Sequence, residues 1–211
     1  MKIIKWRSVG GAIFFINLAM KKSELRKKYL EKRKLLSEEE IFQKSENIFK
    51  NFIEYFKPLP QQKAHIFIPI NKFREMNTRF FTSYFFSRNI RVFVPKIVDI
   101  MLISVEIFED TAFSLNQWGV LEPVSNEDSG ITDFDYVITP LLYADKNGNR
   151  VGYGKGFYDD FFRNISSESK KIGVNYFNPD ENIDDVREED ISLDYLVTPT
   201  DVLSFFNKGL E

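Results

Sequence analysis

The residues best suited to chemistry lie in the stretch NRVGYGKGFYDDFF, residues 149–162. Gly152, Gly154 and Gly156 occupy alternate positions, and Lys155 lies between two of them. Alternate glycines let successive backbone N–H groups converge on an anion, and a helix that begins directly afterwards adds the positive end of its dipole. The spacing fits neither GxxxxGK[ST] nor GxGxxG, so this is neither a P-loop nor a dinucleotide fingerprint. On these residues alone, an anion-binding loop with Lys155 as its cation and a flexible glycine turn are both open.

A second concentration of charge lies upstream, in residues 21–34, which hold eight cations against two glutamates. Such a run is usually the solvated face of a helix. A site for a phosphate-bearing ligand is the sharper interpretation. The whole chain has a net charge of −2 and a pI near 5.7. Because it has no general excess of lysine and arginine to cover phosphates, we expect no nucleic acid partner.

Cysteine and histidine offer little chemistry. The 211 residues contain no cysteine, which excludes disulfides, zinc–thiolate sites and thiol nucleophiles and is compatible with a reducing compartment, the cytoplasm. The single histidine, His65, begins an apolar run, and we interpret it as a strand-edge residue rather than a general base. A Ser-His-Asp triad would need this histidine, and the chain has no GxSxG elbow.

The first twenty residues combine three cations with an apolar run over residues 9–20, which superficially resembles a signal peptide. The run is too short to span a membrane, and no small-x-small cleavage site follows it. We therefore expect no membrane partner and interpret residues 1–19 as a dispensable extension, with export as the alternative. Residues 20–211 would then form a single domain, which we expect to act as a monomer.

The elements that must position these residues alternate between helices and strands. Ser37 and Glu40 form a capping box before a helix with a wide apolar face that Pro58 would end, and residues 21–35 and 78–89 predict two more helices. Runs rich in β-branched residues predict strands at 65–70, 90–95, 102–108, 135–140, 171–176 and 194–199. This alternation indicates an α/β fold, a three-layer sandwich with a largely parallel central sheet flanked by helices. Three of the runs end in proline, where a strand should give way to a loop, and ligands gather at such carboxyl ends.

The segment DYVITPLLYADKNGNRVGYGKGFYDDF (135–161) closely resembles the signature of the 5-formyltetrahydrofolate cyclo-ligase family, also called methenyltetrahydrofolate synthetases. The cationic helix and the cap that follows it resemble the family's N-terminal K-x-x-L-R helix. Further resemblances follow in the family's order, at REMNT (74–78), VPKI (94–97), WGVLEP (118–123) and EEDISLDYLVTP (188–199). Agreement extends over most of the chain, and only the N-terminal extension falls outside the pattern.

The resemblance implies a reaction. Members of the family convert 5-formyltetrahydrofolate to 5,10-methenyltetrahydrofolate while ATP goes to ADP and phosphate, with Mg²⁺. ATP would phosphorylate the formyl oxygen, N10 of the folate would attack the activated carbon, and phosphate would depart. The glycines and Lys155 would cradle the triphosphate. The expected partners are therefore 5-formyltetrahydrofolate and ATP, and the expected cofactor is Mg²⁺.

The resemblance also implies roles position by position. Lys155, Tyr158 and Arg150 are expected to be catalytic, and Asp159 and Asp190 to bind magnesium, which typically takes one or two protein carboxylates. The implied ATP-binding residues are Lys22, Ser23, Glu24, Leu25, Arg26, Arg150, Val151, Gly152, Tyr153, Gly154, Lys155, Gly156, Phe157 and Tyr158. The implied folate-binding residues are Ile70, Glu75, Trp118, Tyr153, Gly154, Lys155, Gly156 and Phe157. Tyr153 stands where some members carry arginine, which leaves the number of cations around the phosphates open.

Each role has a structural alternative. Glu75 could cap the helix that follows it, Asp190 could be one more surface acid, and Asp159 could simply favour the first turn of a helix. Trp118 could close its turn instead of packing near the pterin. Two other functions compete with the ligase: a module that binds folate or nucleotide without turnover, and an enzyme similar to sugar-phosphate isomerases. The second would need no ATP and would explain neither the cationic helix nor the aspartate pair.

Overall fold

The computed structural model describes residues 19–99, 101–116 and 119–206, so Trp118 and residues 1–18 of the expected extension lie outside the described residues. The helices are α1 (Lys22–Lys34), α2 (Glu38–Phe56), the 3-10 helix η1 (Asn71–Phe73), α3 (Arg79–Ser87) and α4 (Phe157–Asn164). The strands are β1 (Ala19–Met20), β2 (Lys63–Ile66), β3 (Arg91–Val98), β4 (Met101–Ile107), β5 (Phe113–Leu115), β6 (Leu121–Pro123), β7 (Tyr136–Pro140), β8 (Tyr143–Ala144), β9 (Arg150–Val151), β10 (Lys170–Val174), β11 (Asn182–Ile183), β12 (Tyr195–Val197) and β13 (Val202–Ser204).

Within the described residues, seven strands form the central sheet, in the order β13-β12-β10-β7-β2-β3-β4. Neighbouring strands are parallel from β12 to β3, and β13 and β4 close the two edges in antiparallel pairing. The expected α/β fold with a largely parallel sheet is confirmed. All six strands expected from the sequence are present, with boundaries shifted by up to four residues.

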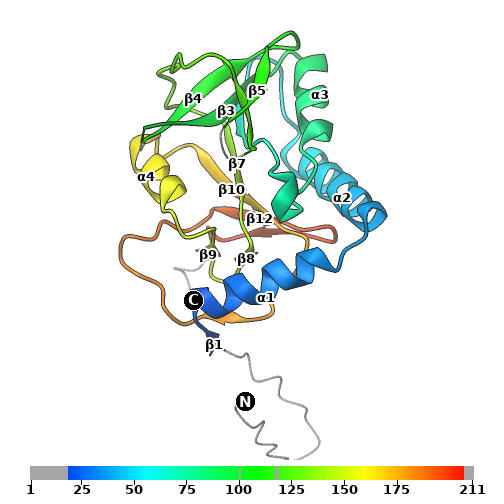
Figure 1. The fold of residues 1–211 in the computed structure, drawn as a ribbon, viewed down its shortest axis with the longest axis vertical. Coiled ribbons are helices and arrows are strands. Elements are labelled where there is room, and N and C mark those ends of the chain that lie inside the picture. Colours follow the sequence, from blue (N-terminus) through cyan, green and yellow to red (C-terminus); the bar gives the residue numbers. More distant parts are fainter. Residues whose placement is uncertain (1–18, 100, 117–118, 207–211) are drawn as a thin grey trace, which may run out of the picture.

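The sheet has helices on both faces, because alternate residues of a strand point to opposite sides. Val92, Val94 and Ile138 pack in one cluster with the apolar residues of α2 and α3. Their neighbours Phe93 and Val137 pack in a separate cluster with the phenylalanines of α4. Figure 1 shows α2 and α3 on one side of the sheet and α4 on the other. The three-layer arrangement follows from this alternation.

The cationic helix α1 lies against the small β8–β9 hairpin (Figure 1). Leu25 and Tyr29, one turn apart, are fully buried there with Val151, and the Tyr29 ring stacks on Tyr143 with centroids 4.4 Å apart. The apolar stripe therefore fixes the helix on the hairpin that precedes the glycine loop. The cations on the rest of its surface do not all face solvent, as described below.

Helix α2 begins and ends where the sequence predicts. Glu40 N–H donates to the Ser37 side chain at 3.1 Å, and Ser37 N–H donates back to the Glu40 carboxylate at 2.7 Å. The helix ends at Phe56, and Lys57 takes a left-handed conformation before Pro58. No helix in the described ranges is long and apolar enough to cross a membrane.

The interpretation of Pro95 as the end of a strand is wrong. Pro95 lies inside β3, opposite Ser104 of β4. Ser104 N–H donates to Asp128 at 3.3 Å, and its carbonyl accepts from Ser129 N–H at 2.8 Å. The backbone of β4 therefore finds its partners in the 128–129 segment at this point, and a residue without an N–H is tolerated.

The interpretation of His65 as a strand-edge residue is also wrong. His65 belongs to β2, which lies between β3 and β7 in the interior of the sheet. The imidazole is fully buried, 4.5 Å from the Phe161 ring between centroids. Burial lowers the pKa of His65 to about 3, so the ring is neutral. The residue packs in the core.

Candidate active site

A cavity of about 1080 Å³ opens at the carboxyl ends of β2, β3 and β7. The strand β2 ends at Ile66, four residues earlier than the run 65–70 predicts, and the chain that follows lines the cavity instead of continuing the sheet. Contributions come from α1, the glycine loop, the start of α4 and the segment before β12. The lining residues used below are Lys22, Arg26, Phe67, Ile70, Phe73, Glu75, Arg150, Tyr153, Lys155, Tyr158, Asp159 and Asp190. Parts of the chain that are far apart in sequence meet here.

The glycine loop is a turn of defined conformation that contacts α1. Gly154 and Gly156 have φ angles of +90° and +75°, which residues other than glycine rarely adopt. Arg26 Nε donates to the Gly152 carbonyl at 3.0 Å. A Cβ on Gly154 would lie 3.3 Å from the Arg26 guanidinium carbon. Glycine is therefore needed at position 154 for its conformation and for the close approach of Arg26.

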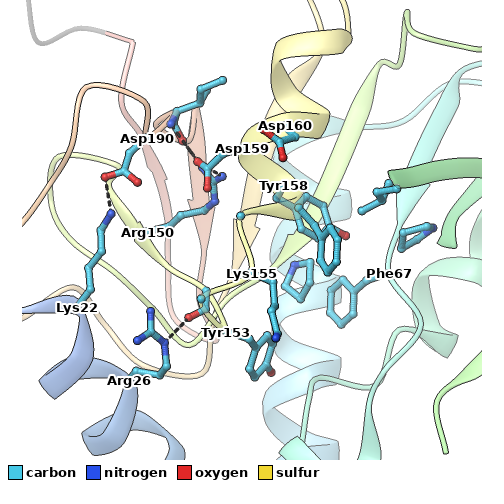
Figure 2. A pocket seen from close by; sticks show the side chains of 18 of the residues that line it. Lys22, Arg26, Phe67, Arg150, Tyr153, Lys155, Tyr158, Asp159, Asp160 and Asp190 are labelled. Atoms are coloured by element: carbon cyan, nitrogen blue, oxygen red, sulfur yellow. Dashed lines mark hydrogen bonds and ion pairs between the residues drawn. The ribbon is translucent and has the colours of Figure 1, made fainter. Parts of the chain in front are cut away.

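Lys155 is the cation of the loop. Its side chain is exposed and makes no ion pair or hydrogen bond with the rest of the described chain. Gly156 is the N-cap of α4, which begins at Phe157, so Lys155 stands just before the positive end of a helix dipole. Figure 2 shows Lys155 between the aspartates on one side and Phe67 on the other. An unpaired cation at this place can meet an anion from either direction.

One side of the cavity, here called the charged side, pairs two aspartates with two cations (Figure 2). Lys22 Nζ donates to the Asp190 carboxylate, and Arg150 donates to Asp159 at 2.7 Å. The Asp159 carboxylate also accepts from the N–H of Ile191, the residue after Asp190, at 3.2 Å. Burial would raise the pKa of Asp190, but hydrogen bonds from Lys22 and from Arg187 N–H hold it below the usual range.

The two aspartates of the charged side fit a magnesium ion that is coordinated by phosphate oxygens as well. Asp159 and Asp190 each engage one carboxylate oxygen with the cations, and their second oxygens accept no hydrogen bond from the described residues. No group of three or more acidic, histidine or cysteine side chains suited to a metal occurs among the described residues. Mg²⁺ usually keeps waters and takes one or two protein carboxylates beside phosphate oxygens. Two aspartates suffice for such a site and would not hold the ion as a closed cage.

The opposite side, here called the aromatic side, is built around Glu75. Its carboxylate accepts from the Tyr153 hydroxyl at 2.5 Å and from Ile70 N–H at 2.7 Å. The Tyr153 ring stacks on Phe73 with centroids 4.6 Å apart. Burial raises the pKa of Glu75, while Tyr153, Ile70 N–H and the nearby Arg33 oppose the rise. A buried acid fixed by two donors beside flat rings suits a heteroaromatic ligand with N–H groups.

Tyr158 lies between the two sides. Its ring lines the cavity and makes an edge contact with Phe161. Its hydroxyl is buried and has no hydrogen-bond partner among the described residues, and burial raises its pKa. The phenol is therefore neutral and has an unused donor.

The structure brings together most, but not all, of the residues that the resemblance selected. Lys22, Ser23 and Arg26 line the cavity, as do the glycine loop and both aspartates. The side chains of Leu25 and Val151 are fully buried under α1, away from the lining. Glu24 accepts from Lys21 N–H at 3.1 Å at the start of α1. Trp118 lies outside the described residues.

Two further residues have clear places in the site that the sequence did not lead us to expect. Asp185 accepts from Lys22 N–H at 2.6 Å, and Arg33 donates to the Tyr153 hydroxyl at 3.2 Å. For Asp185, one of several acids in its segment, the sequence offers no signal. For Arg33 a signal exists, because Leu25, Tyr29 and Arg33 follow one another at intervals of four on the buried face of α1.

Comparisons with known proteins point to one family. A model of the 5-formyltetrahydrofolate cyclo-ligase family matches residues 19–199. The chain is 31% identical over 149 residues to a probable 5-formyltetrahydrofolate cyclo-ligase of Schizosaccharomyces pombe, covering 62% of this chain and 72% of the relative. It is 28% identical over 163 residues to the 5-formyltetrahydrofolate cyclo-ligase of Mycoplasma pneumoniae, covering 74% and 86%.

Solved structures give the same result. The 5,10-methenyltetrahydrofolate synthetase of Aquifex aeolicus superposes with a TM-score of 0.72 at 29% identity, over 91% of this chain and 97% of that one. The 5,10-methenyltetrahydrofolate synthetase of Mycoplasma pneumoniae superposes with a TM-score of 0.66 at 25% identity, over 85% and 99%.

Proposed function

The chain belongs to the 5-formyltetrahydrofolate cyclo-ligase family, and from this premise we propose that it converts 5-formyltetrahydrofolate to 5,10-methenyltetrahydrofolate with ATP and Mg²⁺. The observation that carries the proposal is the joining of two unlike sides in one cavity. Paired cations and aspartates suited to a triphosphate face a buried acid and aromatic rings suited to a pterin. The loop that carries Lys155 lies between them.

In the proposed reaction the formyl oxygen attacks the γ-phosphorus, and the bond to the bridging oxygen of ADP breaks. N10 then attacks the formyl carbon, loses its proton, and the carbon–oxygen bond breaks as phosphate leaves. Catalysis of phosphoryl transfer depends mainly on positioning and on charge stabilisation. Lys155, exposed in the lining of the cavity, can follow the charge from the phosphate to the formyl oxygen.

The remaining residues bind and orient. Arg26 holds the loop through the Gly152 carbonyl, and Lys22 and Arg150 are available to phosphate oxygens once their aspartates are engaged elsewhere. Asp159 and Asp190 would hold Mg²⁺, which neutralises charge on the phosphates when bound. Glu75 and Tyr153 would orient the pterin. All these groups come from one chain, so we propose a monomer, and the absence of cysteine fits the cytoplasm.

An absorbance assay for methenyltetrahydrofolate tests the proposal. We expect product from 5-formyltetrahydrofolate only when ATP and Mg²⁺ are both present, and none with a non-hydrolysable ATP analogue. A protein that binds both ligands but forms no product would be a binding module. Product formation without ATP would contradict the ligase reaction and favour an isomerase-like enzyme.

A further inference from the structure

A small cluster of buried polar groups lies behind Glu75. A second space, of about 10 Å³, shares Glu75, Phe67 and Pro140 with the main cavity. Arg33, from the last turn of α1, and Asn175, just after β10, also line it. This volume is about that needed to enclose one water molecule.

Arg33 is buried without a direct ionic partner. Arg33 is 4% exposed, and no carboxylate of the described chain lies within ion-pair distance of its guanidinium. One terminal nitrogen donates to the Tyr153 hydroxyl at 3.2 Å, and the other donates to the Leu141 carbonyl. Because a buried charge is costly unless it is compensated, this guanidinium needs a nearby anion. The acid it reaches, through the Tyr153 hydroxyl, is Glu75.

Asn175 is also buried without hydrogen-bond partners for its side chain in the described part of the chain. It is 1% exposed, and neither atom of its amide has a hydrogen-bond partner among the described residues. The Nε of Arg33 is likewise buried and without a partner there. Buried amides and guanidinium groups are nearly always hydrogen-bonded, to protein or to ordered water. One water in this space would accept from Arg33 Nε and donate to the Asn175 amide oxygen.

We propose that Arg33 is a positioning residue for Glu75. With the Tyr153 hydroxyl, and with one water bound between Arg33 Nε and Asn175, it holds the Glu75 carboxylate as an anion directed at the folate. The effect on catalysis rests on the proposed function, whereas the effect on Glu75 itself does not. No role for Arg33 follows from the motifs that identify the family.

The charges around Glu75 support this assignment. Arg33 faces it from α1, Tyr153 and Tyr158 from the glycine loop and the start of α4, and Tyr176 from the segment after β10. The neighbouring Arg74 adds a cation from the same segment as Glu75, but its guanidinium pairs with Glu38 at 2.9 Å. Among these groups Arg33 is the cation that lowers the pKa of Glu75, against the rise caused by burial.

The direct test is a titration of the Glu75 carboxyl carbon by NMR in protein carrying ¹³C-labelled glutamate, with Glu75→Gln used to assign the signal. Arg33→Met should raise the pKa of Glu75 by about one unit, the low end for loss of a nearby opposite charge. The matched control is Lys34→Met, one residue along α1, where an exposed lysine pairs with Glu31 at 2.8 Å. An unchanged Glu75 pKa in folded Arg33→Met would overturn the proposal.

Asn175→Leu gives an independent test, which also serves if Arg33→Met does not fold. It leaves the guanidinium in place and removes the partner of the water, so a smaller rise in the same direction is expected. No change at Glu75 in this variant would remove the water from the proposal.

Kinetics connect the positioning role to the reaction. In Arg33→Met the acid limb of kcat/KM for the folate should move to higher pH, because Glu75 would protonate earlier as the pH falls. KM for ATP should stay unchanged, and Arg33→Lys should restore most of the profile. An equal loss for both substrates with no pH shift would indicate a merely structural role. If the wild-type protein formed no product, the proposed function would fail while the titration of Glu75 would still decide the role of Arg33.

Discussion

The two sides of the cavity hold their polar groups in different ways. On the charged side, Lys22 and Asp190 are ion-paired with side chains 17% and 23% exposed, and Asp159 is 26% exposed beside Arg150. On the aromatic side, Glu75 is 7% exposed and already accepts two hydrogen bonds. The carboxylates of the charged side are partly exposed to water, whereas the hydrogen bonds of Glu75 on the aromatic side are complete before any ligand binds.

The difference indicates how each ligand would be received. The Lys22–Asp190 pair is partly exposed, and such pairs are weak, so an incoming triphosphate and its metal can replace it at low cost. A buried and hydrogen-bonded acid is costly to disturb, so it selects a ligand that matches it. We therefore expect variants on the charged side to change ATP and Mg²⁺ requirements and leave folding intact. Variants on the aromatic side should act on the folate.

Removal of Lys155 should have the largest effect. Lys155→Ala is expected to lower kcat by roughly two to three orders of magnitude, the scale seen when one preorganised charge-stabilising group is lost. Lys22→Ala, on the outer helix, should mainly raise KM for ATP, because Lys22 binds in the ground state as well. Steady-state kinetics with both substrates separates the two effects. Lys27→Ala, an exposed lysine of α1 outside the cavity lining, is the control. Near-normal kcat in Lys155→Ala would make the loop a scaffold, with Arg150 the next candidate.

The aspartates should give the next largest effect. Asp159→Asn and Asp190→Asn keep the size of the side chain and remove its charge. Loss of a residue that only orients a metal ligand already lowers metal affinity by about 10–100-fold, so the Mg²⁺ concentration for half-maximal rate should rise by at least as much. The matched control is Asp133→Asn, since Asp133 is exposed, lies outside the cavity lining and pairs with Lys63 at 2.6 Å. Rates measured against Mg²⁺ concentration check this. Unchanged Mg²⁺ dependence in both variants would contradict the metal assignment.

A smaller effect is expected from one methyl group in the loop. Gly154→Ala and Gly130→Ala both place a side chain at positive φ, +90° and +64°, so each should lose about 1 kcal/mol of unfolding free energy. Only the new Cβ at position 154 would meet Arg26, whereas nothing lies within 4 Å of the one at 130. KM for ATP should therefore rise by about tenfold in Gly154→Ala alone, since small displacements of positioning groups are costly. Equal KM values in the two variants would show that the contact with Arg26 is not needed.

The smallest effect is expected at the N-terminus. A chain that begins at Met20 should match the full chain in activity and thermal unfolding, because the charged side begins at Lys22. Met20 itself should be kept, since it pairs with Ile183 of β11 and its carbonyl accepts from Asp184 N–H at 2.9 Å. A chain that begins at Ser23 loses this pairing and Lys22 together, and should bind ATP more weakly. Loss of activity on removal of residues 1–19 would make them part of the domain.

Much of the fold could be predicted from the sequence because its signals are local. The capping box at Ser37 and Glu40 set the start of α2, and the run rich in β-branched residues at 135–140 indicated the strand β7. The glycines before Phe157 indicated a loop that opens a helix. Local rules failed at Pro95, because Ser104, which lies opposite it in β4, finds its hydrogen-bond partner in the loop at Asp128 and not in β3.

What the sequence alone determined was the α-helices, six strands of the central sheet and the family. The tertiary structure decided which side chains meet: Lys22 reaches Asp190 across 168 residues, and Glu75 reaches Tyr153 across 78. It also decided that Arg33, one cation among eight in residues 21–34, is buried behind Glu75 while Lys34 beside it faces water. The physical reason is that helix and strand periodicity is written in neighbouring residues. The pairing of distant groups depends on the order of the strands and on where α1 packs.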